Sequence, residues 1–433
     1  MTIGSSFFIA IRYLLGRAHE GGRYLRGAAG GIALSLIPIM VTLIVSDGMI
    51  RGITDRYLEL GTGHLQVYDF LDAQDVESAL PLIAAARENG GLPGEDALRG
   101  ITGVWAERQG LGVLMGAKGK SGASIRAVDP AFWEEPGSGK FLKTIEGSSH
   151  LESDREVLLG EELARSVGAG VGKMVYIMTV TVGADGRNIP RTLPYTVRGI
   201  VSSGYRELDS LWCIMSYEGG RKLLAPELSS HYLMVKIDDP YKKVDDVAWT
   251  LSRILGPGYS VYTWQELQRS QSSSYESTRQ MLLFIMALIV VVAAVNVSSA
   301  TSMLVIERRR DIAVLKAGGA SPAGIVRIFL WGSFLTGLTG GVIGISLGLC
   351  IGYFVNPIIH GLERLLGFFS NLFHGDAIKI LDPGYYLETI PVIIDWNMVL
   401  VIFFFTLFSS ILASLIPARQ AGKTAPLDIL RKY

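Results

Sequence analysis

Four long apolar stretches constrain this sequence more than any other feature. They lie near residues 28–50, 281–306, 325–355 and 398–416. Each approaches or exceeds the length of about 20 helical residues that crosses roughly 30 Å of hydrocarbon. Hydrophobic residues make up 49% of the chain and charged residues only 18%, a balance typical of membrane proteins. The sequence therefore predicts four transmembrane helices.

The third stretch is also rich in glycine. Its glycines recur at spacings of three and four residues, at Gly337, Gly340, Gly341, Gly344, Gly348 and Gly352. Small residues at these spacings let transmembrane helices approach closely, so we expect this span to pack tightly against its neighbours.

The first stretch has a cleavable signal peptide as its alternative interpretation. A polar lead of more than 20 residues and the sequence Ser46-Asp47-Gly48 fit a cleavage signal poorly. We therefore expect an uncleaved anchor, preceded by an amphipathic helix within residues 1–26 that lies at the cytoplasmic interface.

Positive charge predicts the orientation of the chain. Arginine and lysine cluster before the first span, between the second and third, and after the fourth. The positive-inside rule then places both termini and residues 307–324 in the cytoplasm. Residues 51–280 become one large extracytoplasmic insertion between the first and second spans.

The insertion contains two strand–helix–strand patterns. The first covers residues 63–70, 75–89 and 102–116, and the second covers residues 231–237, 241–255 and 259–264. Two such units around a central segment predict a split, ferredoxin-like lobe with a mostly β insert around residues 118–218. Within the insert, residues 156–180 predict a strand, a short helix and a glycine-rich turn that leads into a hairpin.

The connection of that hairpin, residues 183–194, has two interpretations. It is either a solvated β-turn or a projecting loop that binds another protein. In the second case the candidate residues are Arg187, Asn188, Ile189, Pro190 and Arg191.

Sites for catalysis, metal ions and nucleotides are not evident. The GKS sequence at residues 119–121 lacks the upstream glycine of a P-loop, because position 114 is leucine. The six histidines show no paired-ligand spacing. We therefore expect no enzymatic activity and no bound cofactor in this chain, so that any ATP hydrolysis would have to come from a partner.

Four residues in the spans are candidates for helix packing or for substrate contact. Pro38 is expected to bend the first span, and Asp47 lies at its outer end. Asn296 and Ser299 lie in the second span, where hydrogen bonding between helices is favoured over direct substrate contact.

The segment after the second span, VIERRRDIAVLKAGGAS at residues 305–321, combines charge with an apolar pair. Residues 307–317 are expected to continue the span as helix, Gly318 and Gly319 to end it, and Ser321 with Pro322 to begin the next. Ile312 and Leu315 share a face, and their exposure to the cytosol would require a protein partner. The candidate coupling residues are Arg308, Arg309, Arg310, Asp311, Ile312, Leu315 and Lys316.

This segment resembles the cytoplasmic coupling segment of the MacB/FtsX-like superfamily of ABC transporter permeases. The ending IPARQAGKTAPLDILR at residues 416–431, the 1 + 3 order of spans and the large insertion resemble that superfamily as well. Similarity to the LolC/LolE-type subunits of lipoprotein-releasing systems extends nearly end to end, through GTGHLQV, EVLLGEELARSVGAGVGKMV and SGYRELDSLWCIMS. One departure is Gly318, where relatives usually carry a bulky apolar residue.

The resemblance implies an α-helical inner-membrane protein with four transmembrane helices and a large periplasmic α+β domain between helices 1 and 2. It implies a complex with a cytoplasmic ABC ATPase dimer and a second permease copy or paralogue. That complex would pass lipoproteins to a periplasmic chaperone, and the 183–194 loop corresponds in position to a chaperone-recruiting loop. Which of the two permease types is present stays open.

The expected organisation follows from these predictions. It comprises an N-terminal amphipathic helix (1–26), helix 1 (27–50), a periplasmic domain (51–280), helix 2 (281–306), a coupling segment (307–324), helix 3 (325–355), a short extracytoplasmic segment (356–396), helix 4 (397–416) and a cytoplasmic tail (417–433). The alternatives are a MacB-like efflux permease, an FtsX-like mechanotransmission permease and a membrane-anchored ligand sensor.

Overall fold

The protein, described by a computed structural model, divides into two compact units. The structure describes residues 8–11, 21–69, 76–89, 95–183, 185–372, 387 and 389–423. The first unit consists of Met1–Met49, Ser274–Ile378 and Ile390–Tyr433, and the second of Ile50–Ser273 and Lys379–Thr389. The boundaries between the units fall inside two long helices, α2 and α11.

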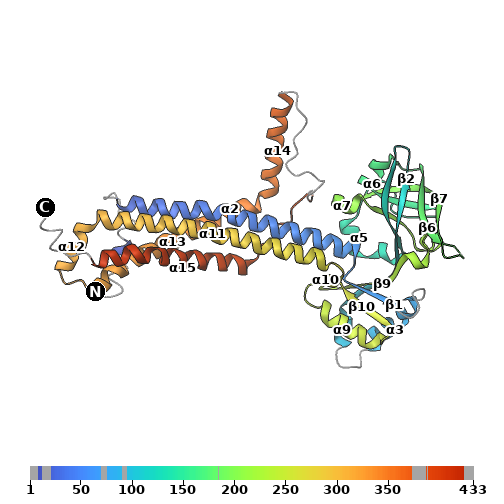
Figure 1. Ribbon diagram of the computed structural model, residues 1–433, viewed down its shortest axis with the longest axis horizontal. Coiled ribbons are helices and arrows are strands. Elements are labelled where there is room, and N and C mark those ends of the chain that lie inside the picture. Colours follow the sequence, from blue (N-terminus) through green and yellow to red (C-terminus); the bar gives the residue numbers. More distant parts are fainter. Residues whose placement is uncertain are drawn as a thin grey trace. The chain divides into compact units, whose positions relative to one another are not determined.

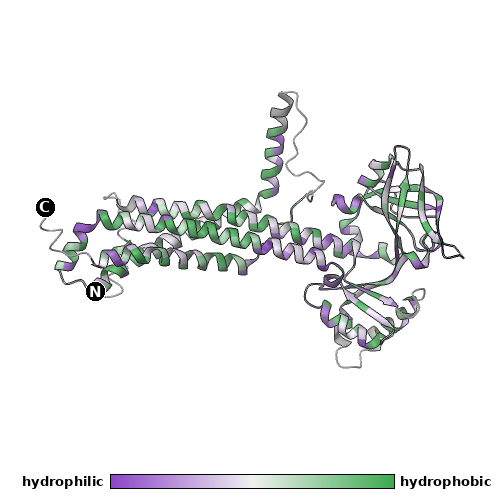
Figure 2. Cartoon of the chain, viewed as in Figure 1, coloured by the Kyte–Doolittle hydropathy of each residue, from purple (hydrophilic) through white to green (hydrophobic). Residues whose placement is uncertain are grey.

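The first unit is a helix bundle. Its helices are α2 (Gly21–Arg56), α11 (Arg269–Glu307), α12 (Arg309–Ala317), α13 (Pro322–Tyr353), α14 (Val355–Leu372) and α15 (Trp396–Lys423). Within this unit α2, α11, α13 and α15 run alongside one another (Figure 1), and hydrophobic residues are frequent along all four (Figure 2). In the part of the chain that the structure describes, these four helices are long and apolar enough to cross a membrane.

The glycines of α13 form two contact faces. A Cβ atom added at Gly344 would lie 2.8 Å from the backbone of Ala33 in α2, and one added at Gly348 would lie 2.6 Å from the Cβ of Met40. On another face, a Cβ at Gly337 would lie 3.0 Å from Ser410 in α15. The predicted close approach of neighbouring helices is therefore confirmed.

The helices differ from those expected in two places. Helix 4 was expected to end at residue 416, just before Pro417, but α15 continues through this proline to Lys423, because Ala418 and Ala421 are fully buried in an apolar cluster with Ile325. α14 was not predicted at all, although residues 356–396 contain it. The expected N-terminal helix and the tail after residue 423 lie largely outside the described residues.

The second unit contains one ten-stranded sheet. Its strands are β1 (Leu65–Asp69), β2 (Ile101–Met115), β3 (Lys120–Val128), β4 (Lys143–Gly147), β5 (Glu156–Gly160), β6 (Met174–Val182), β7 (Asn188–Ser202), β8 (Trp212–Ser216), β9 (Ser229–Ile237) and β10 (Tyr259–Thr263). The order is β10-β1-β9-β2-β3-β8-β5-β7-β4, and β6 pairs with β2 and β7.

The first four strands of that order form one lobe. β10, β1, β9 and β2 are all antiparallel to their neighbours, and α3 (Ala79–Asn89) and α9 (Val244–Leu255) connect them in two β-α-β units. This is the order of a ferredoxin-like lobe, split between β2 and β9. Its core contains Val67, Ile83, Val235 and Leu251, each no more than 2% exposed.

The second lobe is formed by the chain between β2 and β9. Its strands β3 to β8 surround a separate apolar core that includes Ile125, Leu159, Val175 and Val197, all fully buried. Short helices cover its strands: α4 (Ala131–Glu134), α5 (Pro136–Phe141), α6 (Glu161–Val167), α7 (Arg206–Asp209) and α8 (Tyr217–Leu223). β2 joins the lobes, because its first part pairs with β9 and its last part with β3 and β6.

Candidate functional site

The candidate coupling segment begins with a break between two helices. The sequence predicted one helix through residues 307–317, but α11 ends at Glu307 and α12 begins at Arg309. Arg308 lies between them with φ −96° and ψ 15°, outside the helical region. Its guanidinium Nη1 lies 3.0 Å from Asp311 Oδ2, so an ion pair across the first turn of α12 fixes the bend.

The apolar pair of this segment is packed inside the unit. Ile312 is only 2% exposed and belongs to a cluster with Leu25, Leu304 and Ile325. Leu315 is partly buried against the same cluster. The interpretation that this pair faces the cytosol is therefore wrong, because the bend at Arg308 turns α12 back onto the bundle.

The outward face of α12 carries different residues. Arg309 and Arg310 are exposed, as are Ala317 and Gly318. Val314 is the apolar side chain on this face, with 59% of its surface exposed. This face therefore presents two cations, one valine and, at its end, two small residues. Such a surface is complementary to a partner groove that has acidic sides and an apolar base.

The turn after α12 uses one glycine for its conformation. Gly319 has φ +89°, whereas Gly318 has φ −79°, so Gly319 and not Gly318 provides the left-handed residue. A Cβ at Gly318 would lie 3.5 Å from the nearest atoms, an ordinary contact. As predicted, Ser321 caps α13 by accepting a hydrogen bond of 3.2 Å from Gly324 N, and Pro322 follows it.

The polar residues at the far end of the bundle form an ionic cluster. Arg279 Nε lies 3.5 Å from Asp47 Oδ1, and Arg279 Nη2 lies 3.2 Å from Asp395 Oδ2. The cluster joins α2, α11 and the start of α15, so Asp47 has a packing role in this structure. α2 runs without interruption through Pro38.

Asn296 and Ser299 lie on the exposed side of α11. Among the hydrogen bonds described for the chain, none joins either side chain to another helix. The preference for interhelical hydrogen bonding at these two residues therefore stays a prediction. Both residues lie among exposed apolar residues such as Val292 and Val295, and Asn296 Nδ2 lies 4.0 Å from the place of a Cβ atom added at Gly31 in α2.

The hairpin of the second lobe is longer and its turn tighter than the sequence suggested. β6 and β7 pair as far as Val182 and Asn188, so the connection is residues 183–187 and not 183–194. Gly183 N donates a hydrogen bond of 2.8 Å to Arg187 O, and Gly186 takes φ +73°. This turn forms the tip of the hairpin.

The five candidate residues of this hairpin divide into two groups. Arg187, Asn188, Ile189 and Pro190 are exposed, and Ile189 keeps 48% of its surface. Arg191 is exposed as well, but its Nη1 also donates a hydrogen bond of 2.9 Å to Lys222 O. The tip is thus available to a partner, and Arg191 also braces the hairpin against α8.

The second unit contains a buried ionic network that the sequence pattern did not indicate. Arg126 is 1% exposed and pairs with Glu107, which is fully buried, through Nε–Oε1 and Nη2–Oε2 bonds of 2.7 and 2.9 Å. Tyr232 OH lies 3.3 Å from Glu107 Oε1. Burial together with the Glu107 charge raises the pKa of Tyr232, so this phenol stays protonated and donates.

Cationic side chains of this network contact the end of α2. Arg126 Nη1 donates to the carbonyl oxygen of Leu60, and Lys236 Nζ donates to that of Glu59 at 2.8 Å and also pairs with the Glu59 carboxylate. Glu59 and Leu60 lie in the π-helical turn Tyr57–Gly61. Since carbonyl groups at a helix C-terminus lack intrahelical donors, two buried cations satisfy them here.

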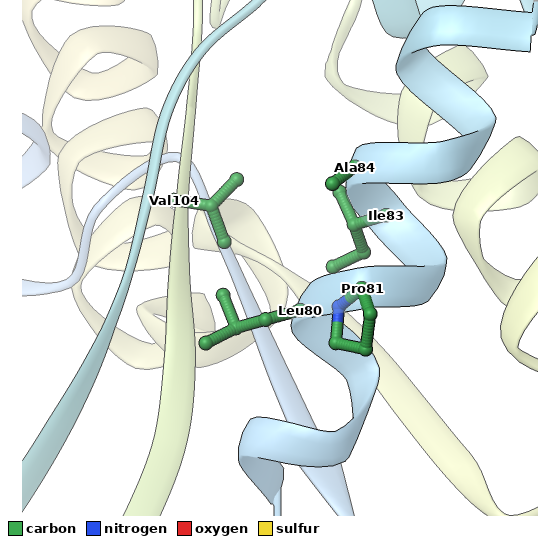
Figure 3. Close-up of a pocket in the computed structure, with 5 residues that line it drawn as sticks. All are labelled: Leu80, Pro81, Ile83, Ala84 and Val104. Carbon is green, nitrogen blue, oxygen red and sulfur yellow. The ribbon is translucent and has the colours of Figure 1, made fainter.

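One apolar depression lies between α3 and β2. It has a volume of about 350 Å³ and is lined by Leu80, Pro81, Ile83, Ala84 and Val104 (Figure 3). These side chains offer no charge and no hydrogen-bonding group. Among the described residues, no group of three or more His, Cys, Asp or Glu side chains is placed to hold a metal ion.

Comparison with known families explains this combination of units. The model of the MacB-like periplasmic core domain matches residues 27–247, just over half of the chain. The chain belongs to this family. The model of the FtsX-like permease C-terminal region matches residues 283–426.

The two matches cover different parts of the chain. The MacB-like match begins in α2 and ends in α9, and the FtsX-like match covers most of α11 together with α12 to α15. The candidate coupling segment therefore lies within the FtsX-like part, and the hairpin and the buried network lie within the MacB-like core.

Relatives that are similar over the full length include two transmembrane proteins of lipoprotein-releasing systems. The lipoprotein-releasing system transmembrane protein LolC of Neisseria meningitidis is 26% identical over 98% of both chains, and LolE of Haemophilus influenzae is 24% identical over 100% of both. Among solved structures, the extracellular domain of the transporter YknZ matches with 10% identity and a TM-score of 0.29, over 46% of this chain and 100% of that one.

Proposed function

We propose that this chain is the transmembrane permease subunit of an ABC transporter that releases lipoproteins from the inner membrane. The observation that carries the proposal is the similarity to LolC and LolE over essentially the whole of each chain. In this role the chain crosses the inner membrane four times, with its termini and α12 in the cytoplasm and its MacB-like core in the periplasm. The chain itself binds no cofactor, and a separate ATPase uses ATP and Mg²⁺.

The outward face of α12 is the proposed contact with that ATPase. Arg309, Arg310 and Val314 are exposed there, while Ile312 and Lys316 fasten the helix to the bundle. A displacement of the ATPase would therefore move α12 together with the ends of α11, α13 and α15. The partner that completes the complex is a second permease, either a copy of this chain or a paralogue.

The hairpin tip, residues 183–190, is the proposed contact with a periplasmic lipoprotein chaperone. The exposed Arg187 and Ile189 combine a cation with an apolar group at the end of the hairpin. We expect Ile189→Asp to weaken chaperone binding to the reconstituted complex without changing ATP hydrolysis. Leu111→Gln is the control, because Leu111 is 81% exposed in the same lobe but lies on β2 and not in the hairpin. Equal binding by all three proteins would exclude this role for the tip.

Depletion of the chain tests the main proposal. Cells that lack it should accumulate lipoproteins in the inner-membrane fraction, and a plasmid copy should restore their normal distribution. Unchanged sorting during complete depletion would contradict the proposal.

A further inference from the structure

α14 presents an apolar face that nothing in the described structure covers. Ile358, Leu362 and Leu365 have 47%, 48% and 57% of their surfaces exposed. Their spacing of four and then three residues places them on one side of a helix. Side chains of this size at helical spacing, left uncovered, indicate an interaction surface.

The opposite side of the helix is polar. His360 Nδ1 lies 3.3 Å from Glu363 Oε2, and Arg364 is exposed beside them. Glu363 and Arg364 occur in the middle of the 18-residue helix. Charged residues in that position are costly at the centre of a bilayer, so α14 is not a further membrane span.

The position of α14 next to α13 indicates what covers its apolar face. Only Phe354 separates it from α13, and both Tyr353 and Phe354 are exposed, by 63% and 50%. Aromatic side chains are enriched where a transmembrane helix leaves the hydrocarbon. The apolar face of α14 therefore continues the lipid-facing surface at the end of this span.

The start of α14 is held to the bundle. Asn356 Nδ2 donates a hydrogen bond of 2.9 Å to Ile390 O, and Ile390 N donates one of 3.0 Å to Asn356 Oδ1. From this anchor the helix extends across the direction of α13 and α15 (Figure 1). A helix that lies across the spans at their end lies along the membrane surface.

We propose that α14 is an interfacial helix that inserts Ile358, Leu362 and Leu365 into the bilayer at the boundary between headgroups and acyl chains. Its polar side then faces the headgroups and water, as in other amphipathic helices that lie in the membrane plane. Because α14 follows the end of α13 opposite to α12, the leaflet is the outer one, an assignment that rests on the topology in the proposed function. There α14 would disturb lipid packing beside the bundle, in the leaflet that holds the acylated substrates before their release.

An environment-sensitive fluorophore on two neighbouring positions tests this. Leu362→Cys and the matched control Arg364→Cys are made in the full chain with Cys350→Ala, since Cys350 is exposed whereas Cys213 is fully buried. Each protein is labelled with an NBD maleimide and reconstituted into phosphatidylethanolamine and phosphatidylglycerol vesicles. Quenching by nitroxide lipids and by aqueous iodide is then measured.

The expected result is a reversal between the two positions. The label at 362 should be quenched several-fold more by nitroxide lipids than the label at 364, and iodide should show the opposite order. Equal quenching of the two labels by iodide would mean that the apolar face lies in water. Protection of the label at 362 from both quenchers would mean that protein covers the face. Either result would overturn the proposal.

A label at a second position of the apolar face shows whether the result depends on the particular residue that is replaced. Leu365→Cys should behave as Leu362→Cys does, because the two side chains share a face. The measurement requires no lipoprotein transport, so its failure is distinguishable from failure of the proposed function.

Discussion

Lys316 Nζ lies 2.6 Å from the carbonyl oxygen of Gly422 and donates a hydrogen bond to it. The bond joins the last turn of α12 to the last turn of α15, which are 106 residues apart in the chain. Together with the burial of Ile312, it makes α12 a part of the bundle and not a free loop. A displacement of α12 would therefore move the helix ends to which it is attached.

Removal of the Lys316–Gly422 hydrogen bond should uncouple ATP hydrolysis from transport. A hydrogen bond with a charged donor contributes about 1.5–3 kcal/mol, so Lys316→Met should loosen α12 from α15. We expect ATP hydrolysis by the assembled complex to persist while lipoprotein release per ATP falls, measured in proteoliposomes. Lys316→Arg, which keeps a cationic donor, should retain most of the release. Equal coupling in Lys316→Met and the wild type would show that the bond does not transmit motion.

The outward and inward positions of α12 should respond differently to a charge. Val314→Asp places a carboxylate on the exposed face and should abolish co-purification of the ATPase with little change in the Tm of the permease alone. Ile312→Asp buries that charge in an apolar cluster and should lower the Tm markedly. The partly buried Leu315 should show both effects as Leu315→Asp. Retention of the ATPase by Val314→Asp would place the contact elsewhere.

Sequence patterns predicted those parts of the fold that depend on local chemistry. The span lengths, the strand alternation near Leu65 and Tyr259, and the serine cap at Ser321 are set by neighbouring residues. The helix break at Arg308 is different, because the Arg308–Asp311 pair and the cluster around Ile312 stabilise it together. No periodicity in VIERRRDIAVLK distinguishes a continued helix from two helices at an angle.

In the candidate sites, too, the sequence predicted features of local origin and not those that depend on tertiary contacts. Arg187 and Ile189 were found because turn residues mark the hairpin, whereas the length of the turn depends on the pairing of β6 with β7. Arg126 was missed because a charged residue in a strand usually faces water. Its burial depends on Glu107, 19 residues earlier, and on the end of α2, contacts that only the tertiary structure creates.

The two glycines after α12 should not be equivalent. Gly319 has φ +89°, a conformation that costs a residue with a Cβ about 1–2 kcal/mol. We expect Gly319→Ala to destabilise the turn by that amount, seen as faster hydrogen exchange of the α12 amides. Gly318→Ala should be neutral, because φ there is −79° and the added Cβ would make ordinary contacts. Equal effects of the two substitutions would contradict this assignment.

Replacing only one residue of the buried Arg126–Glu107 pair should lower the free energy of unfolding strongly. Glu107→Gln leaves the Arg126 charge without its counter-ion in a fully buried position, for which losses of about 3–5 kcal/mol are typical. We expect a large fall in Tm of the full chain. The double variant Glu107→Leu with Arg126→Met should lose less than Glu107→Gln, because no charge stays buried. A larger loss in the double variant would mean that the Arg126 bond to the Leu60 carbonyl dominates.

Two carboxyl groups of the second lobe should give stability changes of opposite sign with pH. Burial raises the pKa of Asp209, although hydrogen bonds from Ser202 and Ser203 oppose this. A hydrogen bond from Lys222 lowers the pKa of the more exposed Asp154. The unfolded chain has ordinary values near 3.8 for both, so the folded state holds its proton more tightly at Asp209 and less tightly at Asp154.

The sign of each effect follows from proton linkage. Ionisation of Asp209 costs stability above its raised folded pKa, and this cost disappears as the pH falls from there to about 3.8. Asp154 contributes stability above about 3.8, and this contribution is lost as the pH falls through its lowered folded pKa. The Tm of the wild type relative to Asp209→Asn should therefore rise as the pH falls from 7 to about 4.

The comparison with Asp154→Asn should move in the other direction, and by a smaller amount because 41% of the Asp154 side chain is exposed. Thermal unfolding of the full chain in detergent at several pH values measures both differences, and titrations common to wild type and variant cancel. A Tm difference for Asp209→Asn that is independent of pH would mean that Asp209 titrates alike in both states. Its hydrogen bonds from Ser202 and Ser203 would then fully offset its burial.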